Sequence, residues 1–215
     1  MQPAQFRSLL EAETAAAGLA LEPACLDRLT AHQRLLVKWN RAVRLIGDLD
    51  PLTIIRRHII ESLRLIPFIL EPRGALLDIG SGNGFPAIPL KAALDQLRLV
   101  MLEPTVRKSQ FLRTVISDLK LSDTTVARER VDKPRDLVKL GRWDCITMRG
   151  VAAIPAVIEG AASALRPNGR VLFLVGDAGR REIEKRIQPP LEIVALQPLP
   201  STQASFIAAV ELRRP

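Results

Sequence analysis

The hydrophobic positions in the first 72 residues recur at intervals of three and four, which is the spacing of amphipathic helices. One such segment begins at Phe6, a second runs from Cys25 to Ile46, and a third from Pro51 to Ile66. The alternating pattern of a half-buried strand does not occur here. We therefore predict an N-terminal helical cap, residues 1–72, which ends at the turn-forming stretch Glu71-Pro72-Arg73-Gly74.

Beyond this turn, short apolar runs alternate with stretches of helical spacing such as 106–119 and 153–165. The apolar runs are Ala75–Ile79, Leu97–Leu102, Thr124–Ala127, Trp143–Met148 and Arg170–Val175. Two more runs, Leu191–Leu196 and Phe206–Leu212, are separated only by the Pro- and Ser-containing segment Gln197–Gln203. The pattern predicts an α/β domain over residues 73–215, with a mostly parallel sheet and a C-terminal antiparallel hairpin.

Composition narrows the class of protein. Of the 215 residues, 47% are hydrophobic and 25% charged, which allows a packed core and excludes a disordered chain. Apolar runs long enough to span a bilayer are missing, a secretion signal is not visible, and there are two cysteines. We therefore expect a cytoplasmic protein without a membrane partner. The net charge of +8 suggests a polyanionic partner, although charge alone is a weak functional signal.

The stretch Leu76–Pro86 carries a strand directly into a loop with glycines at three alternate positions. These are Gly80, Gly82 and Gly84. Glycines permit positive φ and a close approach of the backbone to a ligand. A dinucleotide-binding loop would have a further glycine where Phe85 stands, and Pro86 and Pro89 lack the N–H groups that a pyrophosphate would use. An NAD-dependent oxidoreductase is therefore disfavoured but remains an alternative.

The second predicted strand ends at Glu103, 25 residues beyond Asp78. An acidic side chain at this position can accept hydrogen bonds from both hydroxyls of a ribose. A glycine loop followed by an acidic strand end is the arrangement of class I methyltransferases that use S-adenosylmethionine (SAM). The sequence therefore predicts a SAM site at the ends of the first two strands.

Further segments match a more specific pattern. They are Lys38-Trp39-Asn40, Arg57-His58-Ile59-Ile60-Glu61-Ser62, Asp78 to Leu90, Arg107 to Leu112, Glu129 to Asp132 and Arg149 to Ala152. In these segments the chain resembles the bacterial small-subunit rRNA guanine-N7 methyltransferases, the RsmG or GidB family. The resemblance implies a Rossmann-like class I SAM-dependent methyltransferase fold, with SAM as cofactor and S-adenosylhomocysteine as product. It also implies 16S rRNA as partner, within the small ribosomal subunit or an assembly intermediate, and we expect a monomer.

The resemblance also assigns roles to residues. The implied cofactor contacts are Asp78, Gly80, Gly82, Phe85, Glu103, Pro104, Thr105, Val131, Asp132 and Arg149. Glu103 to Thr105 would meet the ribose, Val131 and Asp132 the adenine, and Asp78 the methionine end. Arg149 would also position the substrate as the catalytic residue. The implied RNA contacts are Arg107, Lys108, Arg130 and His58.

The reaction chemistry fits what the sequence contains. Guanine N7 has an exposed lone pair, so its methylation requires positioning but no general base. Enzymes that methylate amino groups carry Asn or Asp-Pro-Pro-aromatic after the fourth strand, where this chain has Thr147-Met148-Arg149-Gly150. Cys25 and Cys145 lack the Pro-Cys context of cytosine-C5 enzymes. Metal ligands at suitable spacing are absent around His32 and His58, so we expect no metal site.

The chain departs from the family pattern at several positions. These are Arg44-Leu45-Ile46, Ala87, Glu103-Pro104 and Met148. The departures leave two alternatives open, which are a diverged member that acts on another RNA and a non-catalytic rRNA-binding or assembly protein.

Overall fold

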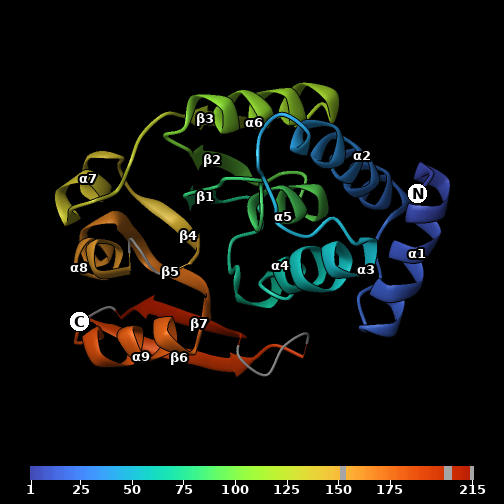
Figure 1. Cartoon of the computed structure of the whole chain (residues 1–215). Coiled ribbons are helices and arrows are strands. Elements are labelled where there is room, and N and C mark those ends of the chain that lie inside the picture. The colour runs from blue at the N-terminus through green and yellow to red at the C-terminus, as the bar shows by residue number, and fades with distance from the viewer. Residues whose placement is uncertain (151–153, 201–204, 214–215) are drawn as a thin grey trace.

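The computed structural model describes residues 1–150, 154–200 and 205–213 (Figure 1). Within these residues a seven-stranded sheet has the strand order β3-β2-β1-β4-β5-β7-β6. The strands are β1 (Ala75–Ile79), β2 (Arg98–Leu102), β3 (Thr124–Ala127), β4 (Trp143–Arg149), β5 (Leu165–Gly176), β6 (Leu191–Pro198) and β7 (Ser205–Leu212). Strands β1 to β5 pair in parallel, while β7 pairs antiparallel with both β5 and β6. The predicted mixed sheet with an antiparallel C-terminal pair is confirmed.

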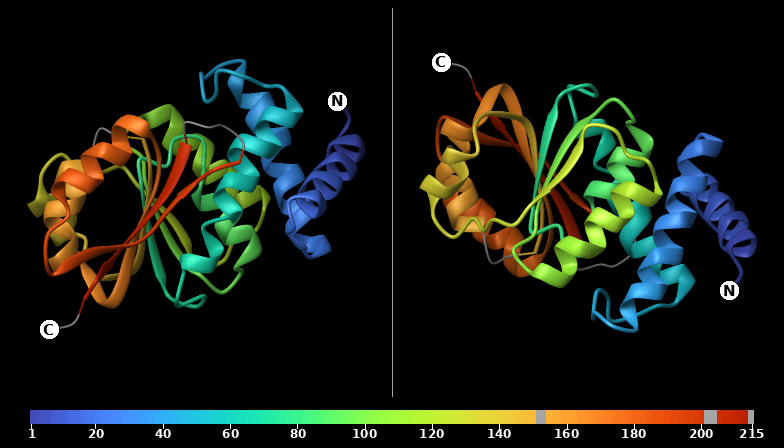
Figure 2. Two further views of the ribbon diagram at one scale, coloured as in Figure 1. Left: turned by 90° about the horizontal axis from the view of Figure 1, so that it is seen from below. Right: turned by 90° about the horizontal axis from the view of Figure 1, so that it is seen from above.

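Helices cover both faces of this sheet. They are α1 (Pro3–Ala16), α2 (Pro23–Asn40), α3 (Pro51–Thr53), the π-helix η1 (Ile54–Ile60), α4 (Glu61–Leu63), the 3-10 helix η2 (Ile66–Phe68), α5 (Ala87–Ala93), α6 (Val106–Asp118), α7 (Pro134–Lys139), α8 (Ile154–Ala164) and α9 (Asp177–Arg186). In both views of Figure 2, α7, α8 and α9 lie on one face of the sheet, and the other helices lie on the opposite face. Among the described residues, no helix combines the length and the apolar character needed to cross a membrane.

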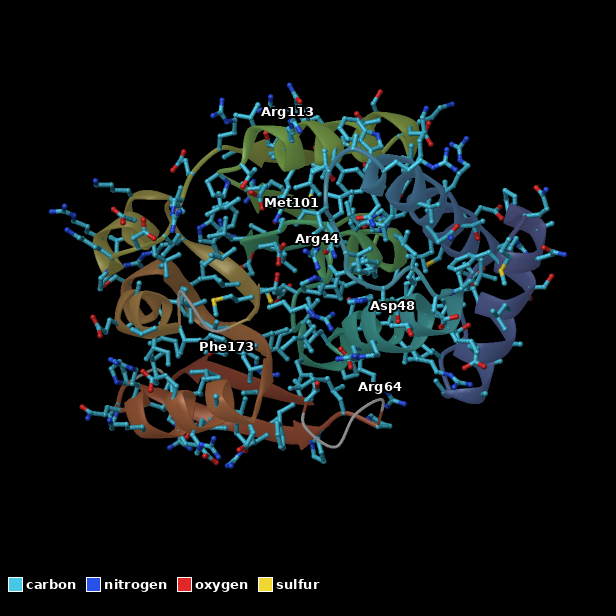
Figure 3. All side chains as sticks on the ribbon, viewed as in Figure 1. Arg44, Asp48, Arg64, Met101, Arg113 and Phe173 are labelled. Atoms are coloured by element: carbon cyan, nitrogen blue, oxygen red, sulfur yellow. The ribbon has the colours of Figure 1, made fainter. Side chains whose placement is uncertain are left out.

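Each face of the sheet has its own hydrophobic core, because successive side chains of a strand point in opposite directions. In β1, Leu76 belongs to the core under the N-terminal helices, and Leu77 belongs to the core under α7, α8 and α9. Figure 3 labels one residue of each core, Met101 and Phe173. The helical cap packs into the first core, since Phe6 and Leu36 belong to the same cluster as Leu76.

The second predicted helix was too long. The apolar period continues to Ile46, but α2 ends at Asn40. The Asn40 side chain accepts hydrogen bonds from the backbone N–H groups of Leu45 and Ile46 at 2.8 and 3.0 Å, and its amide donates to the Ile46 carbonyl at 3.1 Å. These hydrogen bonds fold residues 41–50 back against the end of α2. We call these ten residues, which are part of the helical cap, the cap segment. Leu45 and Ile46 are therefore buried without being helical.

Two further boundaries differ from the predictions. The third apolar segment is interrupted by the π-helix η1 and ends as a regular helix at Leu63. The strand predicted from Arg170 begins earlier, at Leu165, and continues to Gly176. Position 153, where a helix was predicted to begin, and positions 201–203 of the hairpin connection lie outside the described residues.

The strand order creates a switch point. From β1 the chain proceeds outward to β2 and β3, and then returns to place β4 on the other side of β1. In open α/β sheets, ligands bind where the strand order reverses, beyond the carboxyl ends of the strands. This switch point lies at the carboxyl ends of β1 and β4, where Ile79 and Met148 lie side by side.

Candidate active site

The glycine loop leaves the end of β1 and is fixed by the neighbouring strand. The N–H groups of Gly80 and Ser81 both donate to the Leu102 carbonyl, at 3.0 and 2.9 Å. Gly80, Gly82 and Gly84 all have positive φ, at 74°, 51° and 89°. A side chain at Gly80 would meet no protein atom within 4 Å, so the space above this residue is open to a ligand. The loop after β1 therefore has the positive-φ glycines and the room for a ligand that the sequence predicted.

Glu103 follows β2 and holds two backbone groups with its carboxylate. Oε2 accepts from the Gly82 N–H at 3.0 Å, and Oε1 accepts from the Thr105 N–H at 2.7 Å. The side chain is 4% exposed. A carboxylate has about four lone-pair directions. Glu103 therefore has the capacity to accept ribose hydroxyls while it orders the loop.

A pocket of about 250 Å³ opens beside these residues. Its lining includes five of the predicted cofactor residues, namely Gly80, Glu103, Pro104, Val131 and Asp132, together with Ile79, Glu129 and Arg130. Asp132 accepts a hydrogen bond from Arg130 at 3.2 Å. The ends of β1, β2 and β3 therefore converge on one cavity with an apolar side and an acidic side.

Asp78 lies below this pocket in β1 and is 1% exposed. Its Oδ1 accepts from the Thr147 hydroxyl at 2.6 Å, while Oδ2 is buried without a donor among the described residues. Burial raises the pKa of Asp78 to about 6, because the charged form loses its hydration. A hydrogen-bond donor is the partner that such an oxygen lacks.

These observations fit a bound SAM. The methionine end carries an ammonium group, which suits the unpaired Asp78 oxygen; the ribose suits Glu103, and the adenine suits the apolar lining residues Pro104 and Val131. The predicted contacts Gly82, Thr105, Phe85 and Arg149 do not line the pocket itself. Gly82 and Thr105 act on it through Glu103.

Arg149 ends β4 on the other side of β1. Its Nη2 donates to Glu61 Oε2 and to the Arg57 carbonyl, both at 2.7 Å. Glu61 is 2% exposed and Arg149 is half-buried, so this is a partly buried ion pair between the helical cap and the sheet. Arg149 Nη1 is buried and has no acceptor among the described residues. A cavity of about 230 Å³ lies beside the pair, and Leu174, Leu199 and Ser205 contribute to its lining.

The ring of Phe85 faces the helical cap. It is 3% exposed and packs between His58, with ring centroids 5.1 Å apart, and His32, at 5.0 Å. Burial lowers the pKa of both histidines to about 4, so both rings are neutral near pH 7. The roles of Phe85 toward SAM and of His58 toward RNA stay predictions, and the described contact of His58 is its stacking on Phe85.

The other predicted RNA contacts lie at the surface. Arg107 on α6 and Arg130 after β3 are exposed, and Lys108 is half-buried. Figure 3 places Arg113, another cation of the same region, at the outer side of α6. Their contact with RNA stays a prediction. Groups of three or more His, Cys, Asp or Glu side chains arranged for a metal ion do not occur in the ranges that the structure describes.

Three residues with clear roles in this geometry were not assigned them from the sequence. Thr147 pairs with Asp78, Glu61 pairs with Arg149, and His32 contacts the glycine loop. Glu61 lies within a segment that matches the family, but its partner is 88 positions away in the chain. A sequence pattern carries no signal for such a pairing, whereas the polar Thr147 inside an apolar strand was a signal that could have been used.

The sheet order, the glycine loop and the acidic strand end define a Rossmann-like class I SAM-dependent methyltransferase. Two solved structures show the same fold at low sequence identity. A ribosomal protein L11 methylase from Lactobacillus delbrueckii subsp. bulgaricus has a TM-score of 0.62 and 14% identity, covering 79% of this chain and 81% of that one. Aeropyrum pernix fibrillarin in complex with natively bound S-adenosyl-L-methionine has a TM-score of 0.55 and 19% identity, covering 70% and 73%.

The chain belongs to the family described as GidB, rRNA small subunit methyltransferase G, which matches residues 26–196. A relative from Syntrophus aciditrophicus (strain SB), named ribosomal RNA small subunit methyltransferase G, is 33% identical over 187 residues, or 85% of this chain and 76% of that one. A relative of the same name from Halorhodospira halophila is 30% identical over 195 residues, or 91% and 90% of the two chains. The resemblance identified from the sequence is confirmed.

Proposed function

We propose that this protein transfers the methyl group of SAM to N7 of a guanine in 16S rRNA. Membership of the small-subunit rRNA methyltransferase G family supports the reaction and the class of substrate. The pocket at the ends of β1, β2 and β3 supports SAM as the methyl donor. When bound, SAM supplies a methyl group on a positively charged sulfur, which a lone pair can attack directly.

The choice of N7 as the methylated atom rests on the residue at the end of β4. Position 149 holds an arginine that is committed to Glu61 and to the Arg57 carbonyl. An arginine is always protonated and cannot remove a proton from an amino group or a ring nitrogen. N7 needs no deprotonation, so holding the nucleophile in line with the methyl group is sufficient. The buried Nη1 of Arg149 supplies a donor for an oxygen of the guanine or of its phosphate.

The other site residues form two groups, one that binds the cofactor and one that binds RNA. We infer that Asp78, Gly80, Glu103 and Val131 hold SAM, since they surround or support its pocket. Exposed cations such as Arg107 and Arg130 supply the attraction for RNA phosphates. The chain contains no Tyr and 4% aromatic residues, which favours recognition by charge and shape over base stacking.

We propose a matching division of the chain. Residues 1–72 form a substrate-facing helical extension, and residues 73–215 hold the cofactor. Its place of action is the cytoplasm, and the substrate is 16S rRNA within the small subunit or an assembly intermediate. The protein works as a monomer, because the cofactor pocket and the Arg149–Glu61 pair are both formed within a single chain.

Methyl transfer from labelled SAM tests this proposal. The purified protein is incubated with small-subunit particles, and separately with naked 16S rRNA, from cells that lack the enzyme. We expect label at one guanine N7, which is mapped by cleavage of the rRNA at the modified base. Label at another atom would overturn the chemistry, and RNA binding without label would indicate a non-catalytic protein.

A further inference from the structure

The glycine loop has two halves that are anchored differently. Gly80, Ser81 and Gly82 are held by β2, through the Leu102 carbonyl and the Glu103 carboxylate. The second half, Asn83 to Phe85, has no such strand beside it. Because three glycines give this loop a large conformational freedom when unfolded, its second half needs other anchors to keep one shape.

Besides the packing of Phe85 between His58 and His32, the helical cap supplies two hydrogen-bonding anchors, and both act on Asn83. The Asn83 carbonyl lies 3.0 Å from Nε2 of His32, which is on α2. The Asn83 side-chain amide donates to the Leu45 carbonyl in the cap segment at 3.3 Å. Leu45 itself is fixed by Asn40, as described above. Asn83 is therefore held from two places on the helical cap that are 51 and 38 positions away in sequence.

The surroundings of the His32 side chain suit it to donate a hydrogen bond to a carbonyl group. Its side chain is 1% exposed, and its ring packs against Phe85 and Phe111, at centroid distances of 5.0 and 6.1 Å. A carbonyl oxygen only accepts hydrogen bonds, so Nε2 of the neutral ring carries the hydrogen. The contact is close, because a Cβ built on Gly84 would lie 3.2 Å from the same Nε2.

Because Nε2 carries the hydrogen, His32 is a hydrogen-bond donor to the glycine loop. We infer that His32 is a positioning residue for the cofactor: by donating from Nε2 to the Asn83 carbonyl, it fixes the second half of the glycine loop against the helical cap and, through the loop, the position of Gly80, which lines the SAM pocket. An apolar side chain of similar size would fill the core equally well but would leave the Asn83 carbonyl without its donor. The identification of the ligand as SAM rests on the proposed function. The role of His32 in holding the glycine loop rests only on the contacts of His32 with Asn83 and the neighbouring rings.

Two substitutions separate the hydrogen bond from the packing. In His32→Gln, the amide nitrogen reaches the place of Nε2 and retains a donor. In His32→Leu, the volume is filled without a donor. Cys25→Ala is a packing control, since Cys25 is a buried residue on α2, seven positions before His32.

Binding of S-adenosylhomocysteine, measured by calorimetry without RNA, is the principal readout. We expect the Gln variant to bind within about twofold of the unchanged protein and the Leu variant about tenfold more weakly, a loss typical of one hydrogen bond. Cys25→Ala is expected to lower the thermal midpoint without changing this affinity. In hydrogen exchange, the Gly84 and Phe85 amides are expected to exchange faster in the Leu variant alone.

The inference is overturned if the Leu variant binds within twofold of the unchanged protein, or if the Gln and Leu variants are weakened equally. Should the Leu variant not fold, His32→Asn replaces it, because the shorter amide does not reach Asn83. These measurements contain no RNA, so a failure of the proposed methylation leaves them interpretable. Absence of S-adenosylhomocysteine binding to the unchanged protein would contradict the proposed cofactor and this inference together.

Discussion

The two sides of the site differ in how they are built. On the cofactor side, each group stands directly after the strand that positions it: the glycine loop after β1, Glu103 after β2, and Val131 beyond β3. On the acceptor side, Arg149 at the end of β4 is positioned by Glu61 and Arg57, which are 88 and 92 residues away on the helical cap. The first side is assembled from neighbouring loops, and the second from distant segments.

Because different contacts hold the two sides of the site, substitutions can change the binding of the cofactor and the positioning of the substrate independently. The backbone of the glycine loop and the carboxylates of Asp78 and Glu103 define the cofactor side. The acceptor side depends on one partly buried ion pair between the helical cap and the sheet, so a change at Glu61 alters Arg149 without touching a residue that lines the cofactor pocket. Substitutions should therefore separate cofactor binding from methyl transfer.

The largest effect is expected from Gly80→Leu. A Cβ at this position meets no protein atom within 4 Å, so the leucine side chain extends into the space for the cofactor. Calorimetry should show a loss of S-adenosylhomocysteine affinity of about 100-fold or more, beyond the strain of about 1–2 kcal/mol that a positive φ imposes. Gly141→Leu is the matched control, because Gly141 also has positive φ and open space. Equal affinities of the two variants would refute the placement of SAM above Gly80.

Arg149→Lys should produce the next largest effect. Lysine keeps the charge opposite Glu61 but lacks the second terminal nitrogen of the guanidinium group. We expect kcat/KM for RNA to fall by about 30-fold, or about 2 kcal/mol, while S-adenosylhomocysteine affinity changes by less than about threefold. Arg142→Lys, at an exposed position, serves as control. A loss of cofactor affinity comparable to that of Gly80→Leu would instead assign Arg149 to the cofactor side.

Glu103→Gln should have a smaller effect, confined to the cofactor side. One carboxylate oxygen becomes an NH₂ group, which faces a backbone N–H of Gly82 or Thr105 and cannot accept from it. Affinity for S-adenosylhomocysteine should fall by about tenfold, equivalent to about 1.4 kcal/mol. Glu129→Gln removes the same charge from the exposed rim of the same pocket and should change the affinity by less than about twofold. Identical losses in both variants would mean that net charge, and not the hydrogen bonds of Glu103, determines the affinity.

The smallest effect concerns the pH dependence of stability. The pKa of Asp78 is raised from 3.8 to about 6 in the folded protein, so its contribution to stability is lost as pH rises through about 6. His32 and His58 act in the opposite sense, since their pKa values are lowered from 6.5 to about 4 and stability is lost as pH falls below 6.5. Without ligand, Asp78→Asn should raise the thermal midpoint relative to the unchanged protein by about 2–6 °C more at pH 8 than at pH 5.

Thermal melts at both pH values, with Asp136→Asn on the partly buried first turn of α7 as the comparison, measure this difference. An equal shift at the two pH values would show that Asp78 is ionised throughout this range. Saturating SAM should diminish the gain at pH 8, because an ammonium group beside Asp78 favours its charged form.

Much of the fold followed from the order of residues alone. The strands Ala75–Ile79 and Thr124–Ala127 have the predicted limits, because a short apolar run between turn residues is a local signal. The glycine loop and Glu103 were equally recognisable, since each lies within a few positions of its strand. The end of α2 was not, because the apolar period continues past Asn40 and the side-chain contacts of Asn40 determine where the helix stops.

Tertiary structure decided the rest of the site. The pairing of Arg149 with Glu61, the stacking of Phe85 between two histidines, and the hold of His32 on Asn83 all join segments more than 25 residues apart. Periodicity and turn chemistry report on neighbours along the chain. Which distant side chains meet depends on the strand order and on the packing of the helical cap. The sequence by itself therefore determined the class of fold and the cofactor chemistry, whereas only the folded chain decided how the helical cap positions the glycine loop and Arg149.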